Sequence, residues 1–138
     1  RMKGKVAIVT GGGSGFGEGI CKRYALEGAK VVVNDVNGQQ GQRVADEIQS
    51  AGGTARFIRA DVATAADVNA MVKETIAHFG RLDTMVNNAG ITHRNGPMLD
   101  VEEDEFDRIF AVNVKAIYLA AKAVVPIMRA QGGGVIIN

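Results

Sequence analysis

The sequence is poor in cysteine, proline and tryptophan. It contains one cysteine, two prolines and no tryptophan among 138 residues. A single cysteine cannot form a disulfide within the chain, so Cys21 is expected to be a small, buried apolar side chain in a reducing compartment. The N-terminal stretch lacks the long apolar segment of a secretory signal, and we therefore expect a cytoplasmic protein.

An excess of charge of one sign is also missing. Sixteen basic and fifteen acidic residues leave a formal net charge of +1, so neither nucleic acid nor a membrane surface is expected as a partner. The most apolar stretch, residues 111–128, is interrupted by Asn113, Lys115, Lys122 and Pro126, which argues against a membrane span. No metal site is expected, and small molecules are the favoured partners.

Glycine is abundant: its 18 residues gather in clusters between apolar runs. Five short runs have the composition of buried strands, and they alternate with segments of helical periodicity. The predicted strands are residues 5–10, 30–35, 54–60, 82–88 and 132–138. The predicted helices are residues 15–28, 37–53, 64–80, a helix that begins at Asp100, and residues 114–130.

Side-chain patterns predict details of the last three helices. Val68, Met71, Val72, Ile76 and Phe79 share one face of the helix over 64–80. Asp100 and Glu103 are spaced as a capping box. In the last helix, three- and four-residue spacing predicts the packing face, which comprises Ile117, Ala121, Val124, Val125 and Met128.

Strict alternation of strands and helices predicts an α/β fold. Parallel strands need crossover connections, and right-handed helical crossovers place helices on both faces of the sheet. We predict a Rossmann-like, doubly wound parallel sheet with three αβα layers and one dinucleotide-binding domain over residues 1–138.

The first glycine cluster, TGGGSGFGEG at residues 10–19, lies between the first strand and the first helix. Gly11, Gly15 and Gly17 would let the backbone turn sharply and approach a pyrophosphate beside the N-terminus of the helix. A plain tight turn is the alternative.

Asp35 ends the second strand, 20 residues beyond Gly15. A carboxylate there can accept the ribose hydroxyls of an adenosine and repel a 2′-phosphate, which favours NAD over NADP. No Arg or Lys directly follows it. The alternative is a turn-forming Asp before Asn37 and Gly38.

Three motifs together resemble a known family. TGGGSGFG at 10–17, NNAG at 87–90 and Asn113 in VNV are similar to the N-terminal half of a classical short-chain dehydrogenase/reductase. The resemblance covers the whole chain and implies the strand order 3-2-1-4-5-6-7, truncated here after the fifth strand, so that this domain is incomplete relative to the family.

The resemblance also assigns roles to particular residues. Around the pyrophosphate it places Gly11, Gly13, Ser14, Gly15 and Phe16. Asp61 and Val62 would frame the adenine, with helix capping as an alternative for Asp61. The ribose side would be lined by Asn88, Ala89 and Gly90, while Asn87 would brace the sheet. Asn113 would be the catalytic asparagine, or alternatively a polar residue that fixes a helix break.

Tyr118 and Lys122 have the spacing of the family's catalytic Tyr-x-x-x-Lys, but they precede the fifth strand. In the family this pair and a serine follow that strand, so both are expected beyond Asn138 and the 138 residues alone are expected to be inactive. We therefore interpret Tyr118 and Lys122 as ordinary helix residues, and His78 and His93 as surface residues.

The sequence thus predicts an NAD-dependent oxidoreductase that interconverts an alcohol and a ketone. One alternative is an NADPH-dependent 3-oxoacyl-acyl-carrier-protein reductase. A different class also stays open, a non-catalytic dinucleotide-binding sensor or scaffold. The resemblance implies a homotetramer assembled through the long helices beside the fifth strand, including the helix over 114–130.

Overall fold

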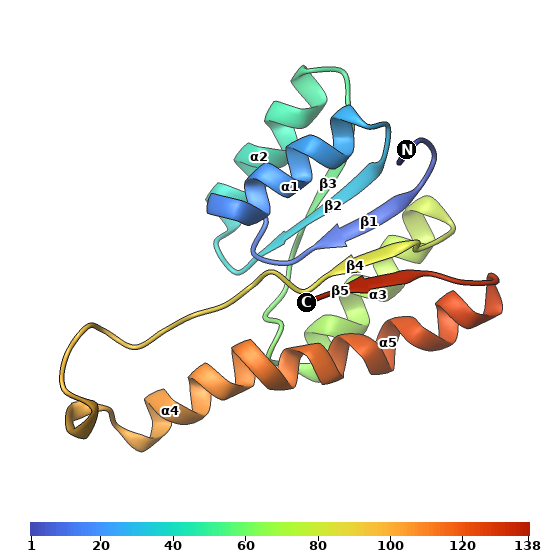
Figure 1. The fold of residues 1–138 in the computed structure, drawn as a ribbon. Coiled ribbons are helices and arrows are strands. Elements are labelled where there is room, and N and C mark those ends of the chain that lie inside the picture. The colour runs from blue at the N-terminus through green and yellow to red at the C-terminus, as the bar shows by residue number, and fades with distance from the viewer.

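The computed structural model describes all residues, 1–138, and contains one parallel sheet (Figure 1). Its strands are β1 (Val6–Val9), β2 (Lys30–Asp35), β3 (Thr54–Arg59), β4 (Thr84–Val86) and β5 (Val135–Ile137). Its helices are α1 (Gly15–Leu26), α2 (Gly38–Ser50), α3 (Ala65–Phe79), α4 (Glu103–Phe110) and α5 (Ala116–Ala130). The strand order is β3-β2-β1-β4-β5, which confirms the predicted doubly wound fold.

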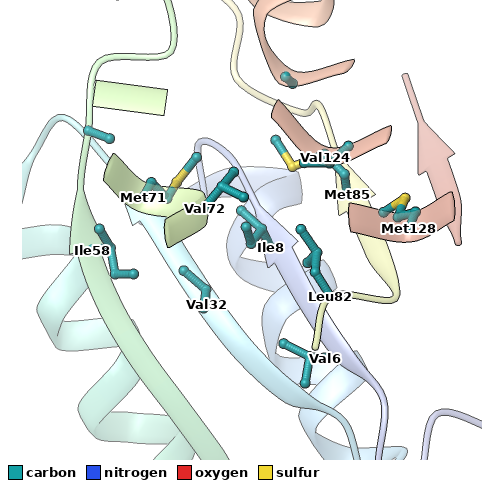
Figure 2. Close-up of a cluster of buried hydrophobic side chains, with 12 residues drawn as sticks. Val6, Ile8, Val32, Ile58, Met71, Val72, Leu82, Met85, Val124 and Met128 are labelled. Atoms are coloured by element: carbon teal, nitrogen blue, oxygen red, sulfur yellow. The ribbon is translucent and has the colours of Figure 1, made fainter. Parts of the chain in front are cut away.

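The central strand β1 is buried along its whole length, as its run of apolar residues predicts. Alternate side chains point to opposite faces of the sheet. Val6 and Ile8 meet side chains of α3 and α5, including Met71 and Val124, and Figure 2 shows this cluster. The helix face predicted over 64–80 is confirmed, since it packs into this cluster.

The other face of the sheet is covered by α1 and α2 (Figure 1). Val9, Val31 and Val33 pack there against Cys21 of α1 and Val44 of α2. Cys21 is fully buried, as expected. Both faces of the sheet therefore carry an apolar core.

The segment before α5 differs from the prediction. Asp100 lies in a short 3-10 turn, Met98–Asp100, and α4 begins only at Glu103, so the predicted capping box is wrong. Asn113 does not mark a helix break either. It lies in a π turn, Ala111–Lys115, that joins α4 to α5 without interruption.

The buried face of α5 is also turned relative to the prediction. Val124 and Met128 are buried as expected, but Ala116, Leu119 and Ala120 complete the face instead of Ile117, Ala121 and Val125. The helical run Glu103–Ala130 is long and apolar enough to cross a membrane by length and composition, a test that core helices also pass. Here the inner face of α5 covers the sheet (Figure 1).

Candidate cofactor site

A cleft of about 370 Å³ lies at the carboxyl ends of the strands, the edge where doubly wound folds bind ligands. Its walls come from the turns after β1, β2, β3 and β4 and from the helical run that contains α4. The residues that line it are Gly11, Ser14, Phe16, Asp35, Val36, Ala60, Asp61, Val62, Asn88, Ala89, Gly90, Ile91, Arg108 and Val112. Of the predicted cofactor residues, only Gly13, Gly15 and Gly17 are not among them.

The glycine loop after β1 needs its glycines for two different reasons. Gly11 and Gly15 have φ values of 63° and 54°, in the left-handed region that side chains disfavour. Gly17 is required by packing, because a Cβ there would overlap the carbonyl oxygen of Gly11. The loop can therefore lie directly against the start of α1.

The N-terminus of α1 has no side-chain cap. Ser14 is the N-cap residue, yet its side chain makes no capping hydrogen bond, and Phe16 beside it is 90% exposed. The first N–H groups of a helix and its dipole favour an anion. An uncapped helix end against a glycine cradle fits the pyrophosphate of a dinucleotide.

Gly13 is held from both sides within this loop. Its N–H donates to Oδ2 of Asp35 at 2.9 Å, and its carbonyl accepts from Nη2 of Arg43 at 3.2 Å. Arg43 also pairs with Glu18 at 2.8 Å. Hydrogen bonds from Arg43 and Lys22 lower the pKa of Glu18 to about 2, so this carboxylate is ionised and keeps Arg43 in place at neutral pH.

Asp35 serves the turn as well as the cleft. Its Oδ1 accepts from the N–H of Asn37 at 2.9 Å, which is the turn interaction that the alternative interpretation predicted. The residue also lines the cleft at the end of β2. Both carboxylate oxygens keep lone pairs for further donors, such as ribose hydroxyls.

Thr10 joins the glycine loop to the NNAG segment. Its Oγ1 accepts from the N–H groups of Asn88 and Ala89, both at 3.0 Å, and donates to the carbonyl of Val86 at 3.2 Å. The Asn88 side chain donates to the carbonyl of Thr10 at 2.9 Å. Asn87 instead donates to Oδ1 of Asn138 beyond β5, in the bracing position that the resemblance implies.

Asp61 and Arg108 form an ion pair on the wall of the cleft, with 3.0 Å between Oδ2 and Nη1. Burial alone would raise the pKa of Asp61, but the N–H of Ala63 and the Arg108 guanidinium lower it below its ordinary value. Asp61 does not cap α3, whose N-cap is Thr64. No local pattern predicts this role for Arg108, because α4 is far from β3 along the chain.

Asn113 holds the loop that follows β4. Its Oδ1 accepts from the N–H of Ile91 and its Nδ2 donates to the carbonyl of Ile91, both at 2.8 Å. These two bonds fix Ile91 on the cleft wall. The catalytic role of Asn113 stays a prediction.

Other reactive side chains lie outside the cleft. Tyr118 is exposed on α5, with Nζ of Lys122 5.6 Å from its ring centre, and neither residue lines the cleft. Burial raises the pKa of the Cys21 thiol to about 12, which makes it a poor nucleophile. No group of three or more His, Cys, Asp or Glu side chains gathers as a metal site would require.

Comparison with known proteins decides the family. The sequence profile described as short chain dehydrogenase matches residues 5–138. The chain belongs to the short-chain dehydrogenase family. A curated relative in this family, 4-formylbenzenesulfonate dehydrogenase from Comamonas testosteroni, is 49% identical over 138 residues, which cover all of this chain and 55% of the relative. The chain thus spans about half the length of the curated relatives it matches.

Two solved structures with the same fold contain a bound dinucleotide. A 3-ketoacyl-(acyl-carrier-protein) reductase from Brucella melitensis, complexed with NADH, has a TM-score of 0.91 and 45% identity over 99% of this chain and 56% of its own. A metagenomic short-chain oxidoreductase in complex with NADP has a TM-score of 0.94 and 36% identity over 99% of this chain and 62% of its own. The chain therefore has the fold of proteins whose solved structures hold NADH or NADP.

Proposed function

We propose that the protein is an NAD-dependent oxidoreductase that interconverts an alcohol and a ketone by hydride transfer, and that residues 1–138 form its cofactor-binding half. The supporting observation is the carboxylate of Asp35, which lines the cleft at the end of β2. Its charge would repel the 2′-phosphate that distinguishes NADP, whereas its lone pairs accept hydroxyl groups. Arg43, the nearby cation on α2, is already paired with Glu18 and Glu47.

The residues of this chain bind and orient the cofactor. The uncapped start of α1 would hold the pyrophosphate, Asp35 the adenosine ribose, and the wall at Asn88 and Gly90 the nicotinamide side. The nicotinamide, when bound, supplies or accepts the hydride. Tyr118 and Lys122 do not line the cleft, so we predict no turnover by residues 1–138 alone.

Arg59 favours the second candidate, an NADPH-dependent 3-oxoacyl-acyl-carrier-protein reductase. Its Nε donates to the carbonyl of Val36, so an exposed guanidinium lies beside the residue that follows Asp35. A guanidinium there can pair with a phosphate. The related reductase from Brucella melitensis was crystallised with NADH, so this activity does not by itself require NADP.

Calorimetric titration with NAD⁺ and NADP⁺ tests the cofactor preference. We expect NAD⁺ to bind at least about tenfold more tightly, and we expect Asp35→Ser to reduce or reverse that ratio because it removes the repelling charge. Arg59→Gln is the matched control and should leave NAD⁺ binding unchanged. Tighter binding of NADP⁺ by the wild type, lost in Arg59→Gln, would support the second candidate instead.

We also propose that copies of the protein associate through the outer face of the run α4 to α5. This face carries apolar side chains at four-residue intervals, each more than half exposed: Phe106, Phe110, Val114 and Tyr118. Contiguous exposed apolar surface of this kind is typical of protein interfaces.

A further inference from the structure

Helix α4 is attached to the rest of the molecule by few contacts. None of its residues is buried, and Figure 1 shows the helix extending beyond the sheet. Its one ion pair with another element joins Arg108 to Asp61, and no other side-chain hydrogen bond leaves the helix. The sheet core therefore does not explain why Arg108 occupies its position.

The π turn helps to direct Arg108 towards the cleft. A π turn holds one residue more than an α turn, so the helix before it is rotated by about 100° relative to a regular helix. Arg108 lies one turn before Ala111–Lys115, whereas Phe106 and Phe110 face outward. Arg108 and Val112 both line the cleft.

Arg108 retains unused binding capacity in that position. A guanidinium has five N–H donors and a flat face that stacks on aromatic rings. Only Nη1 has a protein partner, the Asp61 carboxylate, and the side chain is 48% exposed. The other oxygen of Asp61 is held by the N–H of Ala63 at 2.9 Å, so the carboxylate that orients Arg108 is itself fixed.

The neighbouring surface suits a flat, apolar ring. Ala60 and Val62 are buried residues that line the cleft on either side of Asp61. They follow β3, on the same side of β1 as Asp35. In a doubly wound fold that side receives the adenosine of a dinucleotide.

We propose that Arg108 is an adenosine-binding residue, oriented by Asp61 so that its guanidinium forms the α4 wall of the adenine pocket. This inference rests on the proposed dinucleotide-binding function. Asp61 acts on the adenine partly by holding Arg108, and in this respect it is a positioning residue. The pair also ties α4 to the cleft.

Binding of cofactor fragments to the purified protein tests the role of Arg108. Titrations would use NAD⁺, AMP, which lacks the nicotinamide, and nicotinamide mononucleotide, which lacks the adenosine. In Arg108→Gln we expect the dissociation constants for NAD⁺ and AMP to rise about five- to tenfold, with that for nicotinamide mononucleotide unchanged. Arg108→Lys keeps the positive charge but lacks the planar guanidinium, so we expect its binding of NAD⁺ and AMP to be weaker than that of the wild type.

Arg129→Gln, an exposed arginine at the end of α5, is the matched control and should bind all three ligands as the wild type does. Equal AMP binding by wild type and Arg108→Gln would overturn the inference. An equal loss of affinity for all three ligands would also overturn the inference, since it would mean that the substitution disturbs α4 and the whole cleft rather than the adenosine end. Wild type that binds neither NAD⁺ nor NADP⁺ would overturn the proposed function and this inference together.

Discussion

Gly13 shows how single contacts fix the shape of the cofactor loop. The N–H of Gly13 is held by Asp35 and its carbonyl by Arg43, residues on β2 and α2. A Cβ at this position would lie 2.8 Å from Oδ2 of Asp35. The carboxylate proposed to bind ribose therefore also shapes the loop, and replacing it changes both.

Gly17→Ala tests the close contact between α1 and the loop. The added Cβ would overlap the Gly11 carbonyl and press on the Asn88 amide, so we expect a loss of about 1–3 kcal/mol in the free energy of unfolding and weaker NAD⁺ binding. Denaturant titration measures the first quantity and calorimetry the second.

Gly19→Ala is the control two residues further along α1. A Cβ there meets nothing within 4 Å, so the gain in helix propensity should stabilise the protein by about 0.5–1 kcal/mol. Equal stability of the two variants would contradict the packing argument.

Individual site residues differ in how far the sequence predicts them. Asp35 and Asn88 were predicted to line the cleft because strand ends and short motifs fix their place. Arg108 and Arg43 were not, because their partners lie on other elements and no local spacing reports such contacts. A side chain that reaches a site from a helix distant in the sequence can be assigned to that site only when the fold is known.

At the scale of elements, Asp83 joins three strands at the edge opposite the cleft. Its carboxylate accepts from the Val6 N–H at 2.9 Å and pairs with Arg81 and Lys5. Its backbone carbonyl accepts from the N–H of Val135 at 2.9 Å. The starts of β1, β4 and β5 are thus held by one residue.

Asp83 should make the stability of this edge depend on pH. The Arg81 guanidinium, together with Val6 N–H and Lys5, lowers the pKa of Asp83 to about 2 from 3.8. Because the pKa is depressed in the folded state, the ionised carboxylate stabilises the fold above about pH 4, and this contribution disappears as the pH falls towards 2.

Asp83→Asn should therefore cost about 1–3 kcal/mol at neutral pH and show a smaller change in stability between pH 4 and 2 than the wild type. Chemical denaturation at several pH values measures both. Asp104→Asn, at an exposed position on α4, is the control and should follow the wild type. Parallel pH curves for Asp83→Asn and wild type would contradict this prediction.

The helices illustrate what periodicity can and cannot predict. In α3 the apolar residues occupy one face, so the packing face was predicted correctly. In α5 apolar residues occur on most sides, and periodicity alone selected Ile117 and Ala121 over the buried Leu119 and Ala120. The π turn before α5 adds one residue to the helical run. This addition rotates the helix on one side of the turn relative to the other, and no local sequence pattern predicts it.

At the scale of the whole molecule, the proposed interface on α4 and α5 predicts an effect on assembly. Val114→Glu with Tyr118→Glu places two charges on the exposed apolar face, and we expect the protein to change from an oligomer to a monomer. Sedimentation velocity measures the change. Gln39→Glu, exposed on α2, is the control, and a monomeric wild type would disprove the interface.

The bonds from Asn88 and Ala89 to Thr10 also set an order of events during synthesis. The partners are 78 and 79 residues apart, so a ribosome adding about 5–20 residues per second takes about 4–16 s to bring the second after the first. Until β4 pairs with β1, the emerging chain presents its glycine loop without the opposite wall. The proposed dinucleotide would therefore meet a complete cleft only after the central strands β1 and β4 have paired.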